Sequence, residues 1–126
     1  MKLMNNLEFA TEKQKRTKAY AVRVIRFFGK LPKSEEARVL GRQLLRSGTS
    51  VAANYRAVCR AKSAPDFISK MGTVVEEADE SLLWLELLEE AGICSPDLLQ
   101  PLKAESDELL RLFSTSLATA KRRGRN

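Results

Sequence analysis

The chain has 126 residues, of which 44% are hydrophobic and 30% are charged, and its formal net charge at pH 7 is +6. This length and composition fit one folded domain over residues 1 to 126 and exclude a disordered chain. The sequence contains no histidine, which excludes Ser-His-Asp and Cys-His catalytic sites and histidine-containing zinc and di-iron sites. We therefore expect no enzymatic activity, no metal and no other cofactor.

The sequence also carries no sign of a membrane or secreted protein. No window reaches 18 consecutive apolar residues, and the first residues lack the apolar run of a signal peptide. Cys59 and Cys94 do not form a CxxC pair. These features predict a cytoplasmic protein with two free thiols and no membrane partner.

The first predicted helix covers about residues 10 to 30. Its apolar residues recur at a spacing of three, which we interpret as the buried stripe: Ala19, Val22, Ile25, Phe28 and Leu31. Gly29 and Pro32 then end the helix, because glycine weakens a helix and proline restricts the residue before it.

A second helix is predicted to begin after Ser34, whose side chain can cap it, and to run to about residue 63. The stretch RSGTSVAANYRA, residues 46 to 57, is rich in small residues and could instead be a loop or a phosphate cradle. The apolar period continues through it without a break, which predicts a helix. It also lacks the GxxxxGK[ST] and GxGxxG patterns of phosphate-binding loops. We expect Gly48 and Ala53 to let a neighbouring helix approach closely.

Two further helices complete the predicted fold. Ser63 can cap a third helix that runs to about Ala91, where Gly92 can end it. The fourth begins at Ser95-Pro96-Asp97 and leads to a basic tail at about residues 121 to 126. Four helices joined by short connections predict an all-α fold, an antiparallel up-down-up-down four-helix bundle.

Charge is distributed unevenly along the chain. Residues 1 to 33 carry +7 and residues 34 to 64 carry +4, whereas residues 65 to 91 carry −7. In an up-down-up-down bundle, the start of the first helix and the end of the fourth lie at the same end. We therefore predict that cations from both form one nucleic-acid-binding patch: Lys13, Lys15, Arg16, Lys18, Lys121, Arg122, Arg123 and Arg125. No aromatic-rich strand platform is predicted, which favours contact with the phosphate backbone over sequence readout.

The acidic run EEADE, residues 76 to 80, could bind a metal or serve acid–base chemistry. Its carboxylates step around the helix, however, and no histidine accompanies them. We predict instead that Glu76 and Glu80 form structural ion pairs within or between protomers, with partners on the second helix: Arg46, Arg56 or Arg60.

The third helix contains six large apolar residues within seven positions: Leu82, Leu83, Trp84, Leu85, Leu87 and Leu88. Successive helical residues are about 100° apart, so one core cannot receive all of them. We assign Leu82 and Leu85 to the core of the protomer. We assign Trp84 and Leu88 to an interface with a neighbouring copy.

The segment from residue 31 to residue 93 carries the motifs LPKSEE, QLLRSGTSVAANY and EADESLLWLELL. It resembles the bacterial four-helix-bundle proteins encoded within intervening sequences of 23S ribosomal RNA genes. The start of the first helix, EKQKRTKAYAVRV, is more basic than is common in that family. The resemblance implies a ring-forming homo-oligomer, usually a pentamer, without enzymatic activity. Such proteins are similar in shape to accessory proteins of diversity-generating retroelements, which form basic pentamers that engage nucleic acid and a reverse transcriptase.

Two functions follow as hypotheses. The first is a non-enzymatic oligomeric scaffold that binds nucleic acid, RNA or RNA/DNA, through its basic patch. The alternative is a protein-interaction adaptor, such as an accessory subunit of a reverse transcriptase. A carboxylate metalloprotein is a third hypothesis, which the absence of histidine disfavours.

Overall fold

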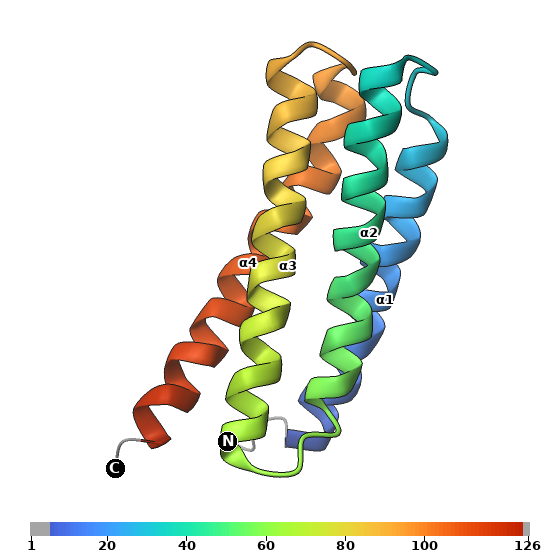
Figure 1. Ribbon diagram of the computed structural model, residues 1–126. Coiled ribbons are helices and arrows are strands. Elements are labelled where there is room, and N and C mark those ends of the chain that lie inside the picture. Colours follow the sequence, from blue (N-terminus) through green and yellow to red (C-terminus); the bar gives the residue numbers. More distant parts are fainter. Residues whose placement is uncertain (1–5, 125–126) are drawn as a thin grey trace.

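Four long helices make up the part of the chain that the computed structural model describes, residues 6 to 124. They are α1 (Asn6–Gly29), α2 (Glu35–Val58), α3 (Ala64–Glu90) and α4 (Pro96–Gly124). Successive helices run in opposite directions and pack side by side, and α1 also meets α4 (Figure 1). The predicted all-α four-helix bundle is confirmed. Within this part of the chain, no helix is long and apolar enough to cross a membrane.

The predicted helix ends are set by local capping. The Ser34 side chain accepts a hydrogen bond from the Ala37 backbone N–H at 3.3 Å, and Ser63 accepts one from Asp66 N–H at 3.1 Å. Both bonds satisfy backbone donors that the first turn of a helix leaves free. After α3, Gly92 adopts a φ of +68°, a conformation that glycine reaches without strain.

The buried face of α1 is not the predicted one. Val22 and Ile25 are exposed, whereas the core takes Tyr20, Val24, Phe27 and Leu31. A helix has 3.6 residues per turn, so a stripe at a constant spacing of three drifts around the helix. The true face alternates spacings of four and three. It continues toward the N-terminus through polar residues, buried Thr17 and Lys13, which the apolar pattern could not reveal.

The small-residue stretch of α2 is helical, as predicted, and its single glycine, Gly48, permits a close helix contact. A Cβ atom at Gly48 would lie 2.8 Å from Cγ2 of Val24, so α1 and α2 approach too closely there for a side chain. Ala53 does not share this role, and that prediction was wrong. Its side chain is exposed because it lies at the edge of the seam between α1 and α2, outside the close contact.

The apolar run of α3 divides between core and surface. Leu85 and Leu88 are fully buried, so the assignment of Leu88 to an interface with a neighbouring copy was wrong. Leu88 follows Leu85 by three residues and lies on the same inward face. Trp84 is partly buried against the core, and its indole N–H donates to Glu80 at 3.4 Å. The exposed members of the run are Leu83 and Leu87.

One polar layer crosses the apolar core, with one hydroxyl from each helix. The Tyr20 hydroxyl of α1 bonds with Ser106 of α4, and Ser81 of α3 donates to Ser47 of α2 at 2.8 Å. Each serine also lies within hydrogen-bond distance of a carbonyl of its own helix. Burial raises the pKa of Tyr20, and the neighbouring hydroxyls oppose this only in part. In the described residues every buried side-chain nitrogen and oxygen has a partner.

Candidate nucleic-acid interface

Two of the cations predicted to bind nucleic acid are engaged within the molecule. Lys13 is only 8% exposed; its ammonium pairs with Glu12 at 2.8 Å and lies 5.0 Å from the centre of the Phe9 ring. Arg16 reaches across to α4, where it bonds both oxygens of Glu105, at 2.9 and 2.8 Å, and pairs with Glu108 at 2.9 Å. The hydrogen bonds to Glu105 raise the pKa of Arg16. Both cations already pair with carboxylates of their own chain, which disfavours a role in binding phosphate.

The other two predicted cations of α1, Lys15 and Lys18, are exposed. Neither forms an ion pair within residues 6 to 124. Lys18 borders a shallow depression of about 320 Å³ between α1 and α2, which is also lined by Gln14, Ala52, Ala53 and Arg56. The two alanines are too short to fill the seam between the helices, so the small-residue stretch opens this depression as well as the Gly48 contact. One cation therefore stands on each side of it, one from each helix.

The arginines of α2 extend this cationic surface along the bundle. Arg38 and Arg56 are 18 residues apart, which is five helical turns, so they project from the same side of α2 about 27 Å apart. Arg42 follows Arg38 by one turn, and Arg60 follows Arg56 just beyond the end of the helix. All four are exposed and form no ion pair within the described part of the chain. We call the surface made by these four arginines with Lys15 and Lys18 the α1–α2 basic face.

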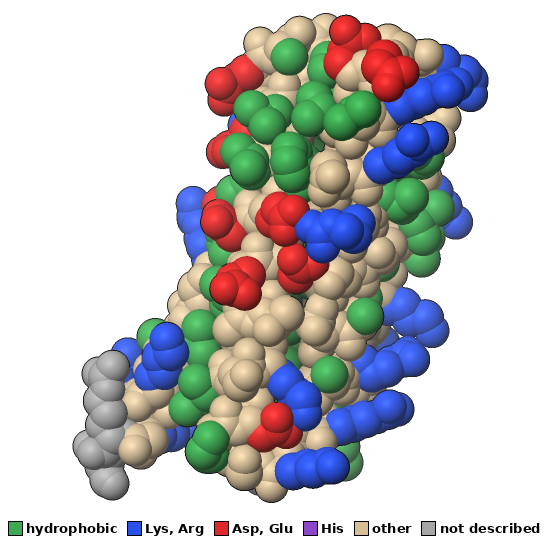
Figure 2. All heavy atoms as spheres, viewed as in Figure 1, with side chains coloured by type: hydrophobic (Ala, Val, Ile, Leu, Met, Phe, Trp, Pro, Cys, Tyr) green, Lys and Arg blue, Asp and Glu red, His purple; other side chains and the backbone are tan. Residues whose placement is uncertain are grey.

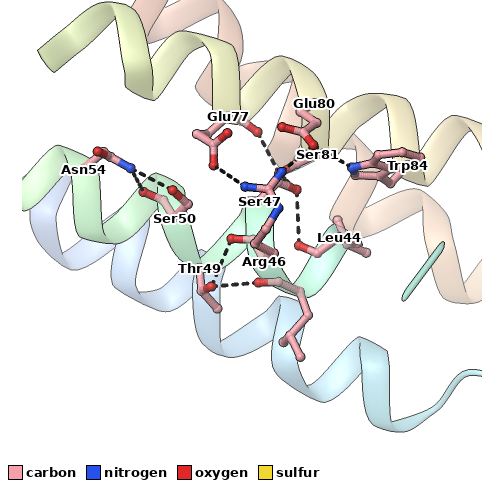
Figure 3. A network of polar contacts seen from close by, with 11 residues as sticks. Leu44, Arg46, Ser47, Thr49, Ser50, Asn54, Glu77, Glu80, Ser81 and Trp84 are labelled. Atoms are coloured by element: carbon pink, nitrogen blue, oxygen red, sulfur yellow. Dashed lines mark hydrogen bonds and ion pairs between the residues drawn. The ribbon is translucent and has the colours of Figure 1, made fainter. Parts of the chain in front are cut away.

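Figure 2 shows the result of this arrangement: Lys and Arg side chains follow the edge of the molecule formed by α1 and α2, whereas Asp and Glu side chains gather over α3. The predicted ion pairs between α2 and α3 hold only for Arg46. Its guanidinium bonds Glu77 at 3.1 Å and also Glu80, which holds the pKa of Glu80 below its ordinary value (Figure 3). Glu76, Arg56 and Arg60 make no ion pair among residues 6 to 124, and Glu77 was not predicted to take part.

The basic end of α4 lies at the same end of the bundle as the start of α1, but the two do not form one patch. In Figure 1, α4 leans away from α1 and α2 toward this end. At its last described residue, a Cβ atom added to Gly124 would lie 3.8 Å from Ile68 of α3. The exposed cations of this segment therefore lie beside α3: Lys121, Arg122 and Arg123. Arg125 lies outside the described residues.

Three cations that the sequence analysis did not single out border a second depression, of about 180 Å³, between α1 and α4. They are Arg23, Arg26 and Lys30, and the lining also includes Phe27, Leu98, Pro101 and Leu102. The alignment of the α2 arginines along one side of the helix could have been predicted from the sequence, because their spacing of 18 residues is visible in it. The second depression could not have been predicted from the sequence, because it depends on how α1 and α4 pack.

Within residues 6 to 124, no three His, Cys, Asp or Glu side chains are grouped so that they could hold a metal ion. Cys59 and Cys94 are free thiols, and burial raises the pKa of Cys94. The candidate interface in the described chain is the α1–α2 basic face, whose exposed cations form no ion pair there.

Comparison with known proteins found a matching family and a similar solved structure. The sequence matches the model of the 23S rRNA-intervening sequence protein family over residues 11–115. The chain belongs to this family. It is also similar to a solved structure from Bacteroides thetaiotaomicron, described as a protein of unknown function from the S23 ribosomal protein family. The sequence identity is 31%, the match covers 82% of this chain and 96% of the other, and the TM-score is 0.76. No curated protein matches the sequence.

Proposed function

We propose that this member of the 23S rRNA-intervening sequence protein family is a non-enzymatic cytoplasmic scaffold that binds RNA, or an RNA/DNA hybrid, through its phosphates. The observation that carries the proposal is the pair Lys18 and Arg56, which stand on opposite sides of one depression without an acidic partner in the described chain. Cations of this kind release counterions when they bind a phosphate backbone.

The rest of the α1–α2 basic face supports the same function. Arg38 lies about 27 Å and Arg42 about 21 Å along α2 from Arg56 at the depression, so a bound strand or duplex would contact cations at two separated places. The face has no exposed Trp or Tyr to stack on bases. Binding through shape and charge, without base-specific readout, is the mode that this chemistry supports.

The scaffold is proposed to act as a homo-oligomer, and the family resemblance supports a ring of five copies. Repetition of the basic face around such a ring would combine weak phosphate contacts into binding of high overall affinity. The alternative is an adaptor for a protein partner, such as a reverse transcriptase. The exposed Leu83 and Leu87 favour it, because apolar side chains of this size suit a protein surface better than a phosphate backbone.

The binding function is tested with fluorescently labelled RNA of random sequence, single-stranded and duplex, titrated with the protein at several salt concentrations. The double variant Lys18→Gln/Arg56→Gln should bind all sequences more weakly. For the duplex, the slope of log affinity against log salt should fall by about 1.8, because each lost phosphate contact contributes roughly 0.9.

The matched control is Lys103→Gln/Arg111→Gln. It removes the same net charge from cations that pair with Glu89 and Asp107, away from the α1–α2 basic face. An equal loss of binding in both double variants would show that net charge alone attracts the RNA. No binding by the parent at about 50 mM salt, where phosphate contacts are strong, would refute the function and leave the adaptor.

A further inference from the structure

Two large apolar side chains of α3 face solvent in an acidic setting. Leu83 is 44% exposed and Leu87 is 37% exposed, and they lie one helical turn apart. The exposed or half-buried charges around them on α3 are all carboxylates: Glu76, Asp79, Glu80, Glu86 and Glu90. Figure 2 shows apolar side chains over the upper half of α3 with Asp and Glu side chains beside them. We call this the α3 acidic surface.

A second exposed apolar pair lies on α1 in the opposite electrostatic setting. Val22 is 39% exposed and Ile25 is 51% exposed, and they are three residues apart on the helix. Arg23 and Arg26 are also exposed and form no ion pair within residues 6 to 124. No Asp or Glu occurs in α1 after Glu12. We call this the α1 docking surface.

The two surfaces lie on different sides of the bundle, and each has one edge near α2. Helices α1 and α3 occupy diagonal positions, since each packs against α2 and α4. Ile25 follows Lys18 by two turns and shares its side of α1, and Lys18 borders α2. Leu87 follows Glu80 by two turns in the same way, and Glu80 pairs with Arg46 of α2. Ile25 and Leu87 therefore mark the edges of the two surfaces nearest to α2, whereas Arg23 and Arg26 lie on the α4 side of α1.

We propose that these surfaces bind each other in different copies of the chain, the α3 acidic surface of one copy against the α1 docking surface of the next. Leu83 and Leu87 would then pack against Val22 and Ile25, which removes both apolar pairs from water. The carboxylates of one copy would lie opposite the guanidinium groups of Arg23 and Arg26 of the other. A basic partner would not fit the α1 docking surface, and an acidic one would not fit the α3 acidic surface.

The geometry of this contact determines the kind of assembly. Two different surfaces meet, so the contact is head-to-tail rather than symmetric, and every copy can bind one neighbour on each side. Every copy repeats the same contact, so successive copies rotate in one sense, and the assembly closes into a ring when that rotation allows it. Lys18 lies one turn from Val22, roughly 6 Å along α1, so it stands at the border of the contact, and the depression extends from it away from Ile25, toward Gln14.

The inference rests on the proposed function only for its homo-oligomeric state, and it is tested without nucleic acid. Ile25→Glu disables the α1 docking surface and Leu83→Glu disables the α3 acidic surface. Both positions are exposed, so neither change disturbs the core. Light scattering coupled to gel filtration at micromolar concentration should report an oligomer for the parent and a smaller species for each variant.

The deciding measurement is an equimolar mixture of the two variants. The Leu83→Glu chain keeps an intact α1 docking surface and the Ile25→Glu chain keeps an intact α3 acidic surface, so one contact can form. The mixture should give a 1:1 species of twice the 14.1 kDa chain mass, which also shows that both variants are folded. Leu7→Glu, at a 76% exposed leucine outside both surfaces, should leave the parent oligomer intact.

Three results would overturn the inference: a monomeric parent, a mixture that stays monomeric, or an equal effect of Leu7→Glu. A failure of RNA binding is a separate outcome, because the Lys18→Gln/Arg56→Gln variant should keep the size of the parent. An oligomer that binds no RNA would refute the proposed binding function and leave the docking contact standing.

Discussion

The close contact of α1 and α2 at Gly48 leads to a prediction that separates packing from helix propensity. In Gly48→Ala, the new Cβ atom would lie 2.8 Å from Cγ2 and 3.0 Å from Cγ1 of Val24. Val24 is fully buried and β-branched, so its methyl groups cannot rotate away from the new atom. Either the two helices move apart or the core around Val24 shifts.

The size of the effect can be isolated with a second glycine. Gly72 lies in the interior of α3, and a Cβ atom there would meet nothing within 4 Å. Both substitutions gain the same helix propensity, about 1 kcal/mol. Gly72→Ala should therefore raise the free energy of unfolding by about that amount. Gly48→Ala gains the same propensity but adds an overpacking cost of about 1 to 3 kcal/mol. Its free energy of unfolding should therefore lie below that of Gly72→Ala by this amount.

Urea unfolding followed by circular dichroism measures both values, at one fixed protein concentration because association adds to apparent stability. The double variant Gly48→Ala/Val24→Ala completes a double-mutant cycle. Removing the Val24 methyl groups should relieve the clash, so the two changes should be coupled by about 0.5 to 3 kcal/mol. Equal stabilities of Gly48→Ala and Gly72→Ala would refute the close-contact account.

Three further predictions concern buried hydroxyls and one ion pair. Burial raises the pKa of both tyrosines, Tyr20 and Tyr55, so folding favours their neutral form. The resulting contribution to the free energy of unfolding is fully present below the unfolded tyrosine pKa of about 10 and is lost as the pH rises above it. Phenolate absorbance should therefore appear only together with loss of the helical signal, and ionisation of a tyrosine in the folded protein would contradict this. Arg46 holds the pKa of Glu80 below its ordinary value, which stabilises the fold above the unfolded glutamate pKa of about 4.3 and is lost as the pH falls toward the folded value. The free energies of unfolding at pH 7 and pH 3, measured by urea titration, should differ less in Arg46→Gln than in the parent, by up to about 1 kcal/mol. An identical pH dependence would disprove it. Tyr20→Phe removes the bond to Ser106 and should lower the free energy of unfolding by about 1 kcal/mol in the same urea assay, whereas an unchanged midpoint would show that the bond contributes nothing.

The helices and most of their ends could be predicted from the sequence because their signals are local, but α2 ends at Val58, about five residues before the predicted end. Ser34 and Ser63 accept hydrogen bonds from backbone groups three residues later, and Gly92 acts through its own φ. The buried face of α1 could not be predicted in this way. Apolar residues occupy more than half of its circumference, and the true core face includes Thr17 and Lys13.

The candidate site was predicted only in part, for a related reason. Lys18 was identified correctly as an exposed cation, but whether Arg16 is free depends on Glu105, which lies 89 residues away. Such a partner becomes visible only when the packing of α1 against α4 is known. The same holds for Leu88: its neighbours in sequence are also leucines, and only the register of α3 against α2 decides which of them are buried.

The polar layer of Tyr20, Ser47, Ser81 and Ser106 has a consequence for the alignment of the helices. If α4 slid by one turn, about 5.4 Å, the serines could still bond the carbonyls of their own helices, but the Tyr20 hydroxyl would lose its partner on α4. A buried unsatisfied hydroxyl costs about 1 to 3 kcal/mol, which would make the shifted arrangement roughly 5- to 150-fold rarer. Leucine layers alone do not discriminate in this way, because one leucine can replace another. The hydroxyls therefore fix the positions of the four helices along the bundle axis, and these positions are the same in every molecule. Surfaces on diagonal helices can then meet their counterparts on another copy in register. A shift in register would otherwise add up from one copy to the next.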